Sequence, residues 1–183
     1  MPIALAAAAI GLAVGLASGG SLKALADTPV RALWLLGAGL ALQIAFGSFD
    51  PGWFDAQTRF WILIGSNLLV VGFLIANLRL PGMWLAAAGL ALNLIVIASN
   101  GAMPVSARAT ETFGGSPPAE GGGFKHEPMT DATTFAVLGD VIPIGPLRLV
   151  ISLGDVLLAA GILYLVFART RAGEGGRHSR DRA

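Results

Sequence analysis

Two aspartates in the C-terminal part of the chain are the side chains best suited to chemistry. Asp140 follows Leu138-Gly139 in a stretch rich in turn-forming residues, and Asp155 lies in an apolar run further on. Two carboxyl groups held close together cannot both ionise, so one stays protonated while the other can activate water. A charged aspartate near a membrane centre costs roughly 2.5–3.5 kcal/mol, which favours a functional role for Asp155. The pair Asp140 and Asp155 is therefore a candidate catalytic dyad, although Asp140 alone is also typical of a solvated loop carboxylate.

Several other polar side chains interrupt or adjoin the apolar runs. They are Gln43, Asn67, Asn93, Asn100 and Ser152. Because a helix rises 1.5 Å per residue, Asp155 lies about 9 Å in from Leu149, and the carboxamides of Gln43, Asn67 and Asn93 lie at a similar depth in their own runs. We therefore expect a shared polar pocket in the outer half of the membrane. For the three carboxamides, interhelical hydrogen bonds of about 0.6 kcal/mol each are the structural alternative.

Lys125 and His126 are neighbours in a long polar segment and complete the set of candidate ligand-binding residues. A lysine beside a histidine can bind a lipid phosphate or another anion. A lone histidine in a loop is more often simply exposed. The predicted binding set is thus Gln43, Asn67, Asn93, Asn100, Lys125, His126 and Ser152.

The composition predicts that these residues are carried by membrane-spanning helices. Of 183 residues, 55% are apolar and 13% charged, and the mean hydropathy is +0.73, whereas a soluble domain has about 25% charged residues. Five apolar stretches lie near 3–17, 32–47, 60–78, 83–98 and 149–168. Backbone in lipid must satisfy its own hydrogen bonds, so we expect an all-α transmembrane bundle, residues 1–168, with one long extracytoplasmic loop at 101–148.

The distribution of basic residues predicts the orientation. With the first connection in the cytoplasm, that side carries Lys23, Arg31, Arg79, Arg169, Arg171, Arg177, Arg180 and Arg182, while Arg59, Arg108, Lys125 and Arg148 lie outside. This is the positive-inside pattern, with the N-terminus outside and a disordered basic tail, 169–183, in the cytoplasm. Ala24-Leu25-Ala26 resembles a signal-peptidase site, but no positive charge precedes the first apolar run, and we expect that helix to be retained.

Composition also excludes several classes of function. There is no cysteine, so thiolate metal sites and cysteine nucleophiles are absent, and only two histidines are present. We expect no metal and no cofactor. A net charge of +1 argues against nucleic acid. The expected partners are membrane lipids, and beyond them another membrane protein or a lipid or peptide ligand.

The C-terminal motifs resemble those of an uncharacterised family of small bacterial integral membrane proteins, classed as a domain of unknown function. The resemblance rests on Asn100-Gly101-x-Met103-Pro104-Val105, on Lys125-His126, on Leu138-Gly139-Asp140-x-Ile142-Pro143, and on Ser152-x-Gly154-Asp155-x-Leu157-Leu158-x-x-Gly161. It implies a bacterial inner-membrane protein and no particular activity.

A weaker likeness connects Leu138-Gly139-Asp140 and Ser152-Leu153-Gly154-Asp155 to the lipoprotein signal peptidases. It implies an intramembrane hydrolase in which Asp140 and Asp155 activate water. The chain departs from that pattern, because Ser152 stands where those enzymes have asparagine and no counterpart of their upstream motif is present. The leading hypothesis is a non-catalytic protein whose outer-leaflet pocket binds a lipid, a peptide or a partner helix. The alternative is the aspartate hydrolase.

Overall fold

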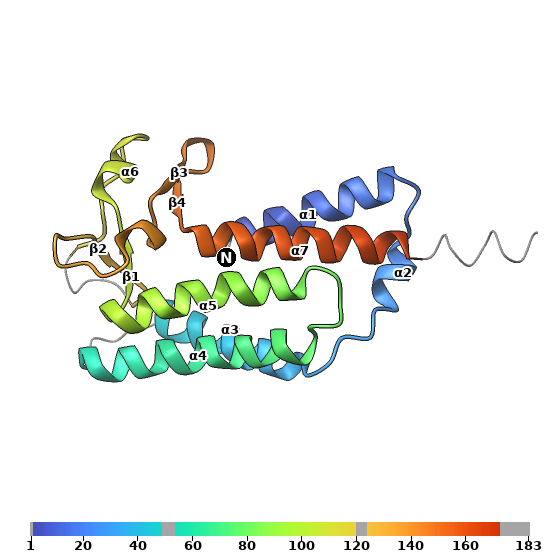
Figure 1. The fold of residues 1–183 in the computed structure, drawn as a ribbon, viewed down its shortest axis with the longest axis horizontal. Coiled ribbons are helices and arrows are strands. Elements are labelled where there is room, and N and C mark those ends of the chain that lie inside the picture. Colours follow the sequence, from blue (N-terminus) through green and yellow to red (C-terminus); the bar gives the residue numbers. More distant parts are fainter. Residues whose placement is uncertain (1, 49–53, 120–123, 173–183) are drawn as a thin grey trace, which may run out of the picture.

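The computed structural model describes residues 2–48, 54–119 and 124–172 (Figure 1). Five longer helices make up most of it: α1 Pro2–Ala17, α3 Leu33–Ser48, α4 Ala56–Ala76, α5 Met83–Asn100 and α7 Leu153–Arg171. The shorter helical elements are α2 Leu22–Ala26, α6 Ala107–Glu111, and the 3-10 turns η1 Ala136–Leu138 and η2 Gly145–Leu147. The strands are β1 Met103–Val105, β2 His126–Pro128, β3 Ile142–Ile144 and β4 Leu149–Ile151.

The helices have the length and composition of a membrane protein. In the described ranges, α4, α5 and α7 are each long and apolar enough to cross a bilayer, and α1 and α3 are shorter apolar helices. The prediction of a helical membrane protein is confirmed. The count of five spans stays a prediction.

The five helices form an open row rather than a closed ring. α1 packs on α7, α7 on α5, α5 on α4, and α4 on α3, whereas α1 and α3, the two ends of the row, have no comparable contact. All five run along the long axis of the molecule (Figure 1). We call the end that carries the four strands the loop end, and the end that carries α2 the tail end.

Glycines allow close packing along α7. A Cβ on Gly161 would meet the backbone of Gly82 and Ala86, so α5 and α7 lie too close for a larger residue. α1 approaches α7 in the same way at Gly11 and Gly15, both buried.

Two small sheets cover the loop end. β1 pairs in parallel with β2, with Met103 opposite His126. On the other side of β1, the Asp140 N–H donates to the Pro104 carbonyl at 2.9 Å, and the Ser106 N–H donates to the Asp140 carbonyl at 2.9 Å. β3 and β4 form an antiparallel hairpin that leads into α7. β1 is therefore paired along both edges.

The predicted fifth span, 149–168, differs at both ends from the helix that the structure shows. Its first three residues are strand β4, and α7 begins only at Leu153 and continues to Arg171. A short apolar run fits a strand or a helix equally well, so the sequence pattern could not separate them. The described part of the predicted tail is thus helical up to Arg171, and the remainder, from 173 on, lies outside the described residues.

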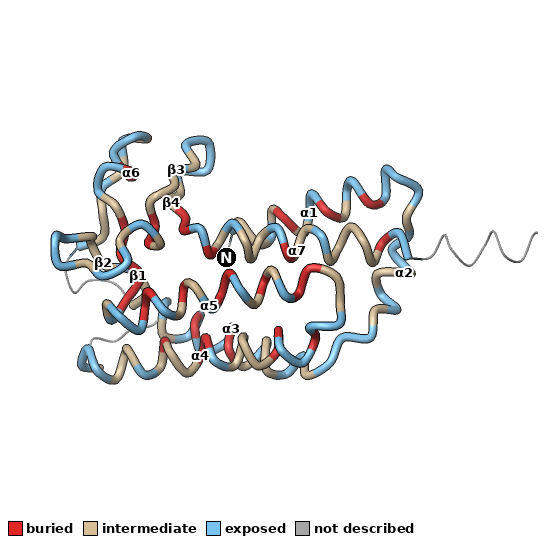
Figure 2. The backbone as a smooth tube through the Cα atoms, in the orientation of Figure 1, coloured by how far each residue is buried: buried red, intermediate tan, exposed pale blue. Residues whose placement is uncertain are grey.

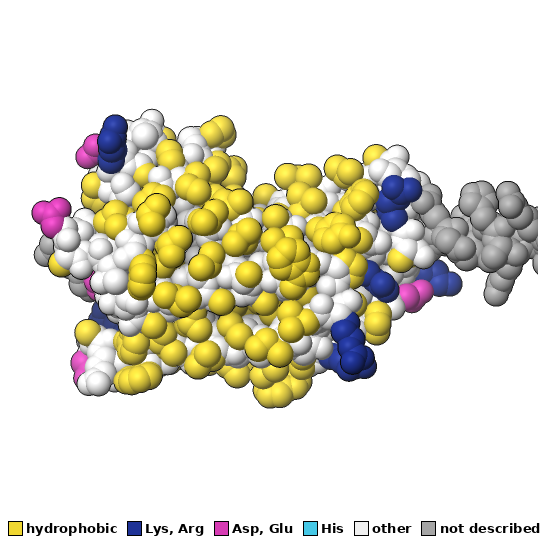
Figure 3. Space-filling view, in the orientation of Figure 1, with side chains coloured by type: hydrophobic (Ala, Val, Ile, Leu, Met, Phe, Trp, Pro, Cys, Tyr) yellow, Lys and Arg dark blue, Asp and Glu magenta, His cyan; other side chains and the backbone are white. Residues whose placement is uncertain are grey.

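The surface is apolar along the helices and charged at the ends. Figure 2 shows the buried residues on the inward sides of the helices, and Figure 3 shows hydrophobic side chains over the face of the helices turned to the viewer. Trp34, Trp61 and Trp84 are each more than half exposed. In Figure 3 most of the visible Lys and Arg side chains gather at the tail end, and acidic side chains are visible at both ends.

Candidate functional site

A cavity of about 180 Å³ lies where the helices meet the loop end. Four of the five long helices, α1, α4, α5 and α7, and strand β1 supply its apolar wall. The residues are Ile3 and Ala4 from α1, Leu63 and Val70 from α4, Leu90 and Ile97 from α5, Leu158 from α7, and Met103 from β1. Its polar lining is Gln43, Asn67, Asn93, Lys125, His126, Asp140 and Asp155. All five long helices and the loop therefore contribute to one polar cavity in an otherwise apolar bundle.

Asp155 is held at the start of α7 by a closed set of hydrogen bonds. Ser152 caps the helix: its Oγ accepts from the Asp155 N–H at 3.0 Å, and the Asp155 Oδ2 accepts from the Ser152 N–H at 3.4 Å. Asn93 on α5 completes the set, since its Nδ2 donates to the Asp155 Oδ1 at 2.9 Å and its Oδ1 accepts from the Ser152 Oγ at 2.8 Å. Both carboxylate oxygens are thus engaged, and α5 is tied to α7.

Gly154 makes this arrangement possible. A Cβ at this position would overlap the Asn93 carboxamide and come within 2.5 Å of the Gly89 carbonyl. The small residue therefore lets Asn93 reach across to Ser152 and Asp155. It also explains why the motif around Asp155 contains glycine.

Asp140 enters the cavity from the loop and is incompletely satisfied. It is only 3% exposed. Its Oδ2 lies 3.5 Å from the His126 Nε2, whereas its Oδ1 is buried with no hydrogen-bond partner among the described residues. Burial, and next the negative charge of Asp155, raise the pKa of Asp140 to about 7. An acceptor with no donor, in a cavity with free volume, is the feature of this site that calls for a ligand.

Lys125 and His126 both line the cavity, at the start of β2. The Lys125 Nζ donates to the Gln43 Oε1 on α3 at 3.0 Å, and burial lowers the pKa of Lys125. Desolvation of the ring, and next the Lys125 charge, lower the pKa of His126, although its side chain is still 52% exposed. Lys125 bonds to a neutral amide, and no ion pair joins it to Asp140 or Asp155 in the part of the chain described here.

Asn67 contributes an amide with spare capacity. It is 7% exposed, and its Nδ2 donates to the Leu63 carbonyl at 2.8 Å within α4. No bond to its Oδ1 exists among the described residues. The oxygen is thus another cavity acceptor that the protein leaves open.

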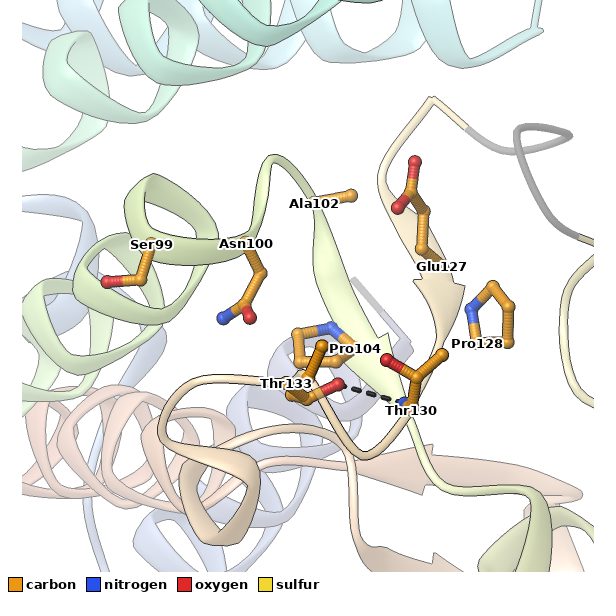
Figure 4. A pocket seen from close by; sticks show the side chains of 9 residues that line it. Ser99, Asn100, Ala102, Pro104, Glu127, Pro128, Thr130 and Thr133 are labelled. Carbon is orange, nitrogen blue, oxygen red and sulfur yellow. Dashed lines mark hydrogen bonds between the residues drawn. The ribbon is translucent and has the colours of Figure 1, made fainter.

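Asn100 does not join the others. Its Nδ2 donates to the Val96 carbonyl at 2.8 Å and the Thr134 carbonyl at 2.9 Å, and its Oδ1 accepts from the Thr134 N–H at 2.8 Å. It fastens the loop to the end of α5. Figure 4 shows it beside a second hollow of about 450 Å³, bordered by Glu127 and Pro128 of β2.

The structure thus brings seven of the nine predicted site residues into one cavity: Gln43, Asn67, Asn93, Lys125, His126, Asp140 and Asp155. Ser152 is fully buried and does not line the cavity, but its Oγ donates to the Asn93 Oδ1. Asn100 lies outside the cavity, at the end of α5. The apolar lining from α1, Ile3 and Ala4, was missed, because nothing in an alanine-rich run shows which neighbours it will have. Asp155 is the third residue of α7, closer to the start of its helix than the six residues counted from Leu149 in the sequence.

The cavity lining can bind the hydrogen-bond donors and acceptors of a ligand, or it can activate a water molecule. Asp140 can accept a hydrogen bond, or donate one when protonated, and Lys125 can bind an anion. Within 2–48, 54–119 and 124–172, no group of three or more His, Asp or Glu side chains is placed to hold a metal ion.

Residues 27–167 match the model of a family of unknown function, DUF5317. No curated protein and no solved structure matches the chain.

Proposed function

Because the chain belongs to this family of unknown function, its role has to follow from the cavity itself, and we propose that it is a multi-pass membrane protein that binds the polar part of a small membrane-borne ligand there. The observation that carries the proposal is the buried, unpartnered Oδ1 of Asp140. A buried polar atom without a partner costs about 1–3 kcal/mol, and more when charged. A ligand that supplies the missing donor removes this cost.

The proposed topology has five spans with the loop end outside a bacterial plasma membrane. Lys23, Arg31, Arg79, Arg169 and Arg171 belong to the tail end. Cytoplasmic segments are enriched in Lys and Arg, which supports a cytoplasmic tail end. The cavity then lies near the outer surface of the membrane.

The binding proposal is tested by native mass spectrometry of the purified, full-length protein. Asn67→Leu is the informative variant, because it removes a cavity amide at nearly constant volume and breaks only a bond within α4. Gly65→Ala is its matched control, since a Cβ there meets nothing within 4 Å. We expect a one-to-one adduct on the wild type and the control that is reduced on Asn67→Leu. Wild-type protein without an adduct, or equal adducts on all three, contradicts the proposal.

A second candidate is the aspartate hydrolase. The observation that favours it is that Asp140 and Asp155 line the same cavity and that the charge of Asp155 contributes to the raised pKa of Asp140. A carboxyl group with its pKa raised to about 7, in the same cavity as a second aspartate, is an arrangement that acid–base catalysis uses. If Asp140→Asn and Asp155→Asn each abolish cleavage of a lipopeptide by reconstituted protein at unchanged abundance, the hydrolase is supported. No cleavage by the wild type removes it.

A further inference from the structure

The charges around the cavity are separated rather than paired. The positive group, Lys125, is bound to Gln43 on α3. The negative groups are Asp155 on α7 and Asp140 beside β1. Asp155 accepts a hydrogen bond from Asn93, and the Oδ1 of Asp140 has no hydrogen-bond partner. The cavity therefore has a cationic side and an acidic side that do not neutralise each other. A ligand that fits both sides carries an anionic and a cationic group.

The acidic side requires hydrogen-bond donors on the cationic group. The Asp140 Oδ1 is a buried acceptor without a donor, and the Asn67 amide oxygen is a further open acceptor. A primary ammonium has three N–H donors, as lysine does, whereas a quaternary ammonium has none. The His126 Nε2 lies 3.5 Å from the Asp140 Oδ2, so the Oδ1 stays open to a ligand.

The row of helices provides a route from the lipid. α1 and α3 are the two unpacked ends of the row, yet Ile3 and Ala4 of α1 and Gln43 of α3 all line the cavity. The cavity thus reaches the side of the bundle where these two helices face each other without packing. Its apolar lining, including Leu90 and Leu158, suits the start of an acyl chain.

We propose that the ligand is a zwitterionic phospholipid with a primary-amine headgroup, which reaches the cavity sideways between α1 and α3. Its ammonium group donates to Asp140 and its phosphate accepts from Lys125, while its acyl chains remain in the membrane. This inference rests on the proposed binding function and names its ligand class.

The test presents the full-length protein with equimolar phosphatidylethanolamine, phosphatidylcholine and phosphatidylglycerol of identical acyl chains, and counts retained lipid by native mass spectrometry. Phosphatidylcholine keeps the phosphate and the positive charge but has no N–H donor. Phosphatidylglycerol keeps the phosphate and has hydroxyl donors without a positive charge. We expect phosphatidylethanolamine to be retained about tenfold over each, as the loss of one charge-assisted hydrogen bond implies.

Two variants locate the effect. Asp140→Asn removes the charge at constant size and should abolish the preference for phosphatidylethanolamine. Glu127→Gln makes the same chemical change on β2, outside the cavity lining, and should preserve it. Ala4→Trp fills the gap beside α3 with the charged groups intact, and should reduce retention of all three lipids. The Ala4 variant keeps the route testable if Asp140→Asn fails to fold.

The outcomes separate the two proposals. A wild type that retains no lipid at all overturns the binding function. Retention without preference for phosphatidylethanolamine, or with preference for phosphatidylglycerol, overturns only the headgroup assignment. Displacement of the lipid by an equal concentration of soluble glycerophosphoethanolamine shows that the free headgroup is sufficient, and overturns the sideways lipid route.

Discussion

Asp140→Asn should stabilise the lipid-free protein, and should do so more at high pH than at low pH. The pKa of Asp140 rises from 3.8 to about 7 in the folded protein, chiefly through burial. Below about pH 4 both the folded and the unfolded states hold the proton, so the carboxyl group carries no penalty. Between pH 4 and pH 7 the unfolded state releases the proton and the folded state keeps it, so stability falls as the pH rises.

The magnitude follows from the same pKa values. One unit of pKa corresponds to about 1.36 kcal/mol, so the charged Asp140 destabilises the fold above pH 7 by at most about 4 kcal/mol. Water that enters the cavity lowers this penalty. We therefore expect a gain of about 1 kcal/mol or more for Asp140→Asn at pH 8, because the carboxamide stays polar but carries no buried charge. For a chain of this size that is about 2–4 °C in Tm.

The assay is thermal unfolding of delipidated protein in detergent at pH 5 and pH 8. Asp155, the N-terminal amino group and His126 are the titratable groups that act on Asp140. All three are retained in the variant, so their own titration largely cancels in the difference. Glu127→Gln controls for loss of a loop carboxylate. A variant that is less stable than the wild type at pH 8, or a difference that does not grow between pH 5 and pH 8, refutes the assignment of Asp140 as a buried, unsatisfied acid.

Three further predictions use other parts of the molecule. Since the chain has no cysteine, single introduced cysteines report the topology. Ser116→Cys should react with an impermeant maleimide added outside intact cells, and Ala172→Cys should not. The reverse labelling contradicts the proposed orientation. Gly154→Ala should lower stability by about 1–3 kcal/mol in thermal unfolding, because its methyl group overlaps the facing helix. Gly65→Ala is the control, since Gly65 has open space around it, and it should be neutral or stabilising by up to about 1 kcal/mol. Equal effects of the two substitutions contradict the close packing. Ser152→Ala should cost about 0.5–2 kcal/mol through the lost helix cap and should also weaken lipid retention; unchanged retention contradicts its positioning role.

The helical part of the site could be predicted because helix geometry is local. The rise per residue places Gln43, Asn67 and Asn93 at comparable depths whatever the packing around them. Their apolar surroundings then force their side chains inward, toward one another, since lipid offers them no partners. The hydrogen bond between Asn93 and Asp155 is the result.

The loop part of the site depends on contacts between distant segments. Asp140 is buried because its backbone pairs with β1, and Lys125 reaches Gln43 because β2 pairs with the other edge of the same strand. Strands of three residues leave no periodic pattern in a sequence, so neither pairing was predicted. The same gap explains Asn100, which was expected to bind the ligand but whose carboxamide bonds to the backbone of Thr134.

A crystal structure of the full-length protein grown in a lipid phase containing phosphatidylethanolamine tests the binding proposal most directly. We expect density for one headgroup in the cavity, with its nitrogen within hydrogen-bond distance of the Asp140 Oδ1 and its acyl chains leaving between α1 and α3. A cavity that holds only water, with Asp140 bonded to the solvent and ordered lipid confined to the outer faces of the helices, contradicts it.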